Sequence, residues 1–127
     1  MPEKLVYEFA LIHFVPKVER GEYMNIGVIL LCKKKKYLQM KYHLDESRLR
    51  ALAPDIDLAN LAAYLRAWDL ICHGSPLGGP IAQLDPPNRF RWLTASRSTI
   101  IQSSKVHPGI CIDPEWVLED LFQKYVL

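Results

Sequence analysis

The chain has 127 residues, the usual size of one domain, and we expect a single domain over residues 1–127. Half of the residues are apolar and 24% are charged, a globular composition that excludes a disordered or fibrous chain. The net charge is only +2, no apolar run reaches the ~20 residues of a membrane span, and the amino end lacks signal-peptide features, so we expect a cytoplasmic protein with no membrane association.

Three strands are predicted in the first third of the chain. Residues 4–16 place apolar side chains on both faces of a strand, which indicates a central strand. After a charged loop in which Gly21 can take a turn conformation, residues 23–32 form a second strand, where Gly27 indicates a bulge or a close approach. A lysine-rich turn leads to a half-exposed strand over residues 37–44. The short links predict an antiparallel meander.

Helix-capping residues mark three helices. Asp45 caps a short helix over 46–53, and Asp57 caps a longer one that ends at Gly74. The sequence Asp113-Pro114-Glu115 begins a closing amphipathic helix. Residues 75–88, rich in proline and glycine, predict a loop with one helical turn at 81–84.

These elements predict an α+β fold. We expect an antiparallel sheet of three to four strands with two main helices packed on one face. Residues 89–109 are expected to cross the sheet edge as irregular chain, with one short strand at Ile100 and Ile101. The three cysteines, Cys32, Cys72 and Cys111, lie far apart among apolar neighbours and predict buried reduced thiols. No zinc-ligand spacing occurs, and we expect neither a metal nor a cofactor.

The segment 89–109 contains no acidic residue and concentrates the positive charge of the chain. Arg89, Arg91, Arg97 and Lys105 give it four positive charges, more than the net charge of the whole protein. It also carries hydroxyl, amide and imidazole groups that bind anions or orient water. A structural explanation is that one or two arginines pair with Glu8, Glu19 or Glu22. The functional explanations are a protein partner, an anionic ligand or nucleic acid.

The candidate binding residues come from this segment and from the turn before the second strand. They are Arg89, Arg91, Trp92, Arg97, Ser98, Gln102, His107, Glu22 and Asn25. We expect the two groups to meet across a shallow cleft, with Arg97 or Arg89 paired to Glu22. Such a cleft would be either a structural clasp or a ligand site.

Two blocks of sequence are more specific than their spacing: VERGEYMNIGVILLC at 18–32 and RFRWLTASRSTIIQSSKVHPGIC at 89–111. Both resemble a bacterial family known only as domain of unknown function thirty thirty-seven, and the similarity runs from about Tyr7 to Tyr125. The chain departs from the family pattern at Ser96, where proline is as frequent. Members are often encoded beside a kinase similar to the HipA toxin kinases, so the resemblance implies a partner role. It assigns no activity.

The leading functional hypothesis is therefore a non-enzymatic binding or accessory module for a HipA-like kinase partner. The alternative is nucleic-acid binding, in which the basic segment joins Lys33 to Lys36, Lys41, Arg48 and Arg50 in one basic face. A metal-independent ribonuclease is a further alternative, with His107 as acid or base and Arg97 and Lys105 stabilising charge. That chemistry needs a second histidine, His13 or His43, brought there by the fold.

Overall fold

A computed structural model of the protein describes residues 2–97 and 99–127. Its strands and α-helices are β1 (Leu5–Phe14), β2 (Met24–Cys32), β3 (Tyr37–Tyr42), α1 (Glu46–Leu52), α2 (Leu58–Cys72), α3 (Pro86–Thr94), β4 (Ile101–Ser103), β5 (His107–Cys111) and α4 (Pro114–Tyr125). Four single turns of 3-10 helix lie between them: η1 (Val18–Arg20), η2 (Lys33–Lys35), η3 (Pro76–Gly78) and η4 (Ile81–Gln83). None of the helices in these two ranges combines the length and apolar character needed to cross a membrane.

All the strands pair antiparallel, and β1 is the strand that the others are arranged around. One edge of β1 pairs with β2, and β2 pairs with β3. The other edge pairs with two short strands in succession, β5 along the first half of β1 and β4 along its end. The α+β prediction is confirmed, but the sheet has five strands because the segment 101–111 supplies two rather than one.

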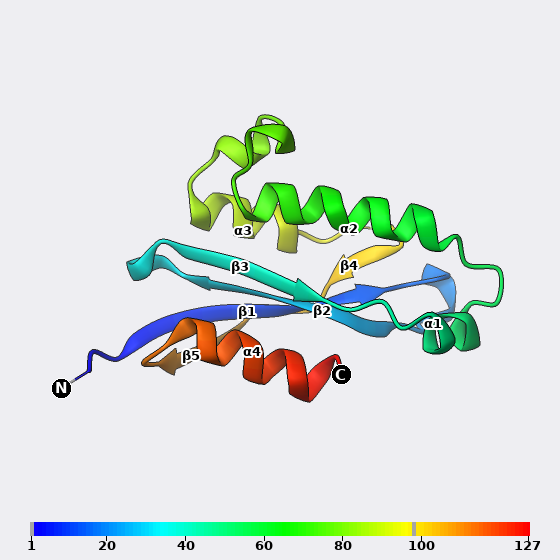
Figure 1. Ribbon diagram of the computed structural model, residues 1–127, viewed down its shortest axis with the longest axis horizontal. Coiled ribbons are helices and arrows are strands. Elements are labelled where there is room, and N and C mark those ends of the chain that lie inside the picture. The colour runs from blue at the N-terminus through cyan, green and yellow to red at the C-terminus, as the bar shows by residue number, and fades with distance from the viewer. Residues whose placement is uncertain (1, 98) are drawn as a thin grey trace.

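The sheet is covered on both faces, which differs from the prediction of two long helices on one face. On one face, Ala10, Ile12 and Phe14 of β1 belong to the larger core, which packs against α2 and α3. On the opposite face, Phe9 and Leu11 belong to a second core beneath α4. Figure 1 shows α2 and α3 on one side of the sheet and α4 on the other. The two faces follow from a strand that is apolar on both sides, since each apolar face must be buried.

The capping predictions are confirmed, and a fourth cap reveals a helix that was expected to be loop. The side chains of Asp45, Asp57 and Asp113 each accept a backbone N–H in the first turn of α1, α2 and α4. Asp85 does the same for α3, accepting from Asn88 at 3.1 Å, with a proline in the first turn. The first six residues of the basic segment, 89–94, are therefore helical and not irregular.

Gly21 and Gly27, in the sequence block 18–32, have the roles expected from the sequence. Gly21 adopts a left-handed conformation at φ 68°, where the chain turns before β2. The register between β1 and β2 shifts opposite Gly27, and a Cβ at Gly27 would lie 2.9 Å from the Lys41 carbonyl oxygen. Gly27 therefore allows β3 to approach β2 closely at the bulge.

Candidate functional site

Arg89 and Arg97, two of the predicted binding residues, are engaged in holding α3 and its neighbours together. Arg89 donates through Nη1 to the Leu84 carbonyl oxygen at 2.5 Å, and its guanidinium lies beside Gly74 at the end of α2. Its buried Nε has no partner among the described residues. Arg89 thus ties the 75–84 loop to α2.

Arg97 caps the end of α3. It donates through Nη1 to the Leu93 carbonyl oxygen at 3.1 Å and through Nη2 to that of Trp92. Its guanidinium carbon lies 4.2 Å from the Trp92 ring centroid and 5.9 Å from that of Trp68. Burial lowers the pKa of Arg97.

The predicted pairing of Arg97 or Arg89 with Glu22 is wrong. Glu22 pairs instead with Arg20, two residues earlier, with 2.6 Å between Oε1 and Nε. A local ion pair across the tight turn at Gly21 needs no long-range approach, whereas the two arginines have carbonyl partners close to them in sequence. The expected clasp between the two sequence blocks is not formed by these residues.

The two blocks do meet, at a different strand. Asn25 and Gln102 are both register partners of His13, so the three side chains share the face of the sheet opposite the larger core. The His13 ring stacks on Tyr23 with 4.0 Å between centroids, and burial lowers the pKa of His13. We call His13, Tyr23, Asn25 and Gln102 the polar row. His13 lies at the centre of the row. The sequence pointed to it only as a possible second histidine beside His107, because the sequence of one strand does not show which residues of other strands pair with it.

One atom of the polar row lacks a partner. The Oδ1 of Asn25 is buried and accepts no hydrogen bond from the described residues. Gln102 donates through Nε2 to the Thr99 carbonyl oxygen at 3.0 Å, which leaves its Oε1 as an acceptor. Buried acceptors without partners are rare in folded proteins, so the row has hydrogen-bonding capacity that the protein itself does not use.

His107 lies away from the arginines. Its ring packs on Phe9, 5.3 Å between centroids, on the face that α4 covers, whereas Arg97 contacts Trp68 on the face that α2 covers. His107 and Arg97 therefore lie on opposite faces of the sheet. Ser98 lies outside the described residues. Arg91 is exposed and contacts Asn88 at 3.4 Å.

The basic residues of the nucleic-acid hypothesis do not form one face. The lysine turn η2 precedes β3 and the arginines of α1 follow it, so they lie at opposite ends of that strand (Figure 1). Several also have partners, and these pairs are Lys34 with Glu3, Lys41 with Glu119, Arg50 with Glu46, and Arg48 with the Val126 carbonyl oxygen. The predicted basic face is therefore divided and partly neutralised.

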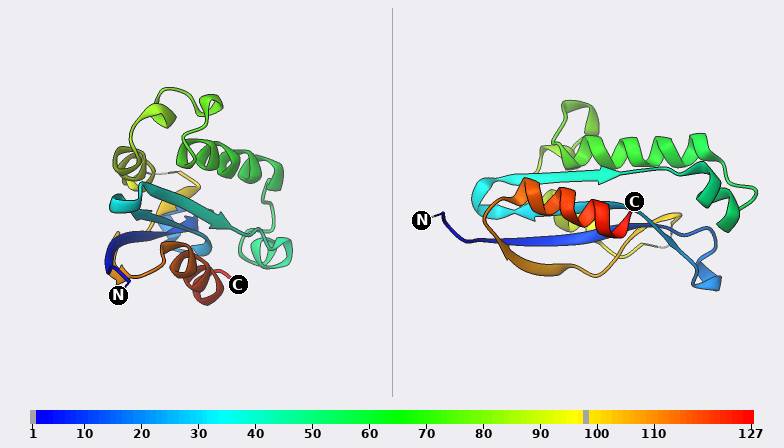
Figure 2. Two further views of the ribbon diagram at one scale, coloured as in Figure 1. Left: turned by 60° about the vertical axis from the view of Figure 1, so that its left-hand side comes forward. Right: turned by 60° about the horizontal axis from the view of Figure 1, so that its bottom comes forward.

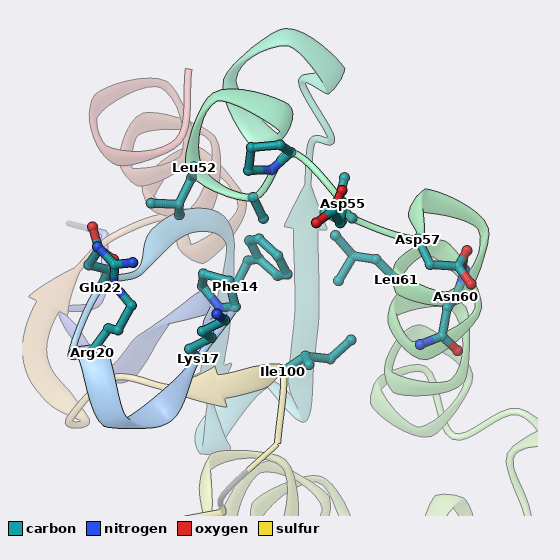
Figure 3. Close-up of a pocket in the computed structure, with 14 residues that line it drawn as sticks. Phe14, Lys17, Arg20, Glu22, Leu52, Asp55, Asp57, Asn60, Leu61 and Ile100 are labelled. Atoms are coloured by element: carbon teal, nitrogen blue, oxygen red, sulfur yellow. Dashed lines mark hydrogen bonds and ion pairs between the residues drawn. The ribbon is translucent and has the colours of Figure 1, made fainter.

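A pocket of about 360 Å³ opens at the end of the sheet where β1 finishes and α2 begins. Figure 3 shows Phe14, Leu61 and Ile100 around its centre, with Arg20 and Glu22 on one side and Asp57 and Asn60 on the other. We call it the end pocket. Of the predicted site residues, Glu22 lines it. Its other polar residues come from the turn before β2, the link between α1 and α2, and the first turn of α2, and a single sequence does not show that these segments meet.

A second surface lies at the other end of β1, on the outer edge of the sheet. Large apolar side chains are exposed there: Val6, Ile110, Ile112 and Trp116, at 65%, 69%, 60% and 64%. We call these four residues the edge patch. The last three border an open hollow of about 730 Å³. Trp116 could have been found from the sequence, since it falls outside the apolar stripe of the closing helix.

The cysteine prediction is confirmed, since Cys32, Cys72 and Cys111 are free and buried. Burial is the main cause that raises the pKa of Cys72, and the charge of Asp69 adds to it. Among residues 2–97 and 99–127, no group of three or more His, Cys, Asp or Glu side chains is arranged to hold a metal ion.

Comparison with known proteins decides the family. The family model described as protein of unknown function (DUF3037) matches residues 9–126, nearly the whole chain. The chain belongs to this family. No curated protein and no solved structure matches it. Three of the motif residues of this DUF3037 chain have packing roles: Gly27 at the bulge, Arg97 at the end of α3, and Gly109, where a Cβ would overlap the Tyr7 ring.

Proposed function

We propose that this chain is a non-enzymatic module that binds a protein partner along the outer edge of β5. The observation that carries the proposal is the edge patch, four large apolar side chains that are each more than half exposed. Contiguous exposed apolar groups of this kind mark interaction sites, and tryptophan is among the residues that most often dominate binding energy.

The backbone of β5 supports the same surface. No strand of the described residues pairs with the outer side of β5. Within a sheet, proline is found where its missing N–H faces away from the neighbouring strand. Pro108 is such a residue, and backbone groups alternate in direction along an antiparallel strand. The N–H and carbonyl of Ile110 therefore face outward, toward a further strand.

The features that prevent another strand from pairing with this edge are not spread evenly along it. The features that discourage edge pairing, namely Lys105 and Pro108, lie in the first half of the 104–112 segment. The second half presents Ile110 and Ile112, with Lys4 and Asp113 beside them. We infer that the occupant is an extended strand of a partner protein, with apolar side chains at alternate positions. The HipA-like kinase implied by the sequence resemblance is the first partner to test.

Co-expression with the neighbouring kinase-like gene product, followed by size-exclusion chromatography, tests the proposal. We expect the two proteins to migrate together at micromolar concentration and Ile110→Glu to separate them, because a carboxylate would be buried in the interface. Leu77→Glu is the matched control, since Leu77 is 83% exposed on η3. Separate migration of the unmodified proteins, or a complex that survives Ile110→Glu, would reject this surface.

Nucleic-acid binding is a second candidate, and the polar row is the observation that favours it. Tyr23 is 57% exposed and stacked on His13, with the amides of Asn25 and Gln102 beside them. Exposed aromatic rings stack bases, each worth about 1–3 kcal/mol.

Titration of labelled single-stranded RNA at two ionic strengths tests this candidate. Binding should weaken with salt and with Tyr23→Ala, whereas Tyr64→Ala, on α2, should have no effect. No binding at low salt would dismiss it.

A further inference from the structure

The end pocket has walls that the backbone fixes in place. The end of β1 is tied to the chain before β4, with Val15 N–H donating to the Ile100 carbonyl oxygen at 2.7 Å. The link between α1 and α2 is closed by a bond from Ile56 N–H to the Ala53 carbonyl oxygen at 3.1 Å. The volume of about 360 Å³ is in the range of small-ligand pockets, roughly 300–1,000 Å³. The site is thus formed before any ligand arrives.

The centre of the pocket is apolar. Phe14 and Leu61 belong to the buried core, and the half-buried Leu52, Ile56 and Ile100 pack against it and line the same cavity. Figure 3 shows Phe14, Leu61 and Ile100 directed toward the middle of the site. An aliphatic or aromatic group would displace water from these side chains, which favours binding.

The two sides of the pocket carry opposite charges, and part of each is not used in ion pairs within the protein. One side has Lys17 and Arg20, and the pairing of Arg20 with Glu22 uses only Nε. The other side has Asp55 together with Asp57 and Asn60, and Asp57 accepts from the backbone of Asn60 as the cap of α2. Among the described residues, Lys17 and Asp55 form no ion pair. One positive and one negative group therefore remain on opposite sides of an apolar centre.

We propose that the end pocket binds a short zwitterionic peptide with apolar side chains. Its amino group lies at Asp55 and its carboxylate at Lys17 and Arg20, while an apolar side chain covers Ile100 and Leu61. A free amino acid fits less well, because its two charges are on adjacent atoms and the charged walls face each other across the centre (Figure 3). A nucleotide is disfavoured by the carboxylates of Asp55 and Asp57.

Amide chemical shifts in a ¹⁵N-labelled sample test this site, with the dipeptide leucyl-leucine as probe. We expect the dipeptide to shift the amides of Asn60, Ile100 and Gly21. Its N-acetylated and C-amidated forms should each bind about 2–5-fold more weakly, because a partly exposed charge pair contributes up to about 1 kcal/mol. Equal binding of all three forms, or no shift at about 10 mM peptide, would overturn the proposal.

Two exposed substitutions assign the ends of the peptide. Lys17→Met should remove the preference for the free carboxylate, and Asp55→Asn should remove the preference for the free amine, each without loss of folding by circular dichroism. Lys105→Met, at an exposed lysine outside the pocket, is the control. Ile110→Glu should leave peptide binding unchanged, so failure of the end pocket and failure of the β5 edge are distinguished. A preference that persists in both pocket variants would contradict the assignment.

Discussion

Arg97 illustrates how one side chain can end a helix and complete a core. Its guanidinium satisfies two carbonyl oxygens at the end of α3 and lies over the rings of Trp92 and Trp68. A positive group at the carboxyl end of a helix also interacts favourably with the helix dipole. Both functions require a planar guanidinium with several donors, and lysine supplies neither the plane nor the fork.

Arg97→Ala is expected to destabilise the fold by about 1–3 kcal/mol, because it removes hydrogen bonds from a charged donor and a cation–π contact. Arg97→Lys should recover only part of the loss. Urea unfolding measures the effect, and Arg91→Ala, at an exposed arginine of the same helix, should change stability by less than about 0.5 kcal/mol. Equal effects of the two alanine variants would show that Arg97 has no special role.

His13 should make the free energy of unfolding depend on pH. Burial lowers its pKa below the ordinary value of 6.5, so the unfolded chain takes up the proton first as pH falls. Stability from the neutral ring is fully present above that value and decreases as pH falls toward the lowered pKa. His13→Gln should reduce this dependence, measured by denaturant unfolding across the window, whereas His43→Gln, at an exposed position, should keep it.

At the scale of elements, Ser104 joins the two strands that share one edge of β1. Its backbone N–H donates to the Leu11 carbonyl oxygen at 2.9 Å, and its Oγ accepts from Leu11 N–H at 2.8 Å. The hydroxyl oxygen takes the place of a backbone carbonyl where the chain between β4 and β5 leaves the ladder. The edge therefore remains hydrogen-bonded to β1 across the interruption.

Ser104→Ala should leave the N–H of Leu11 without its acceptor and cost about 1–2 kcal/mol. Hydrogen exchange locates the effect, since the Leu11 amide should exchange faster while amides of β3 change only with global stability. Ser96→Ala, at an exposed serine, is the control. Unchanged protection of Leu11 would mean that another group, such as water, replaces the hydroxyl.

The elements that the sequence did not reveal are those that depend on tertiary contacts. The start of α3 carries the same Asp-Pro signal as that of α4, but the surrounding prolines and glycines of 75–88 concealed it. Strand β5 contains proline and glycine, which are unfavourable in strands generally. They fit here because Pro108 is on an edge and Gly109 leaves room for the Tyr7 ring.

The whole molecule is a sheet between two unequal helical layers, and both cores share β1 and β2. The left view of Figure 2 shows α2 (green) above the sheet and α4 (orange to red) below it. Apolar residues on both faces of β1 were visible in the sequence, and they required a cover on each side. How the helices divide between the two faces could not be predicted, because the loops are long enough to lead to either face.

The shared strands predict that the two layers unfold together. Leu118 of α4 is 2% exposed, and Leu118→Ala should cost about 2–4 kcal/mol. Far-UV circular dichroism and the fluorescence of Trp68, on the opposite layer, read with Trp92 and Trp116 replaced by phenylalanine, should give coincident transitions, both shifted by the substitution. Leu127→Ala, at an exposed leucine near the same helix, should have little effect. Separate transitions would show that α4 can detach alone.

The candidate site was predictable only in its components. The sequence identified Asn25 and Gln102, which the fold places on either side of His13, but not the strand between them. The predicted pairing of Arg89 or Arg97 with Glu22 was wrong because both arginines bind carbonyl oxygens four or five residues away in sequence, which lie within reach in any case. The end pocket and the edge patch form where segments distant in sequence come together. Composition and local sequence patterns do not predict such long-range contacts.

The arrangement of the outer edge of β1 also bears on how the chain folds during synthesis. The strand made first can pair early with β2, but its other edge is covered only by residues 101–111, near the end of the chain. Such long-range pairing slows folding. A nascent or truncated chain that stops before residue 100 would expose an apolar strand with a free edge, a species prone to aggregate. The last quarter of the chain therefore acts as an intramolecular cover for the first strand.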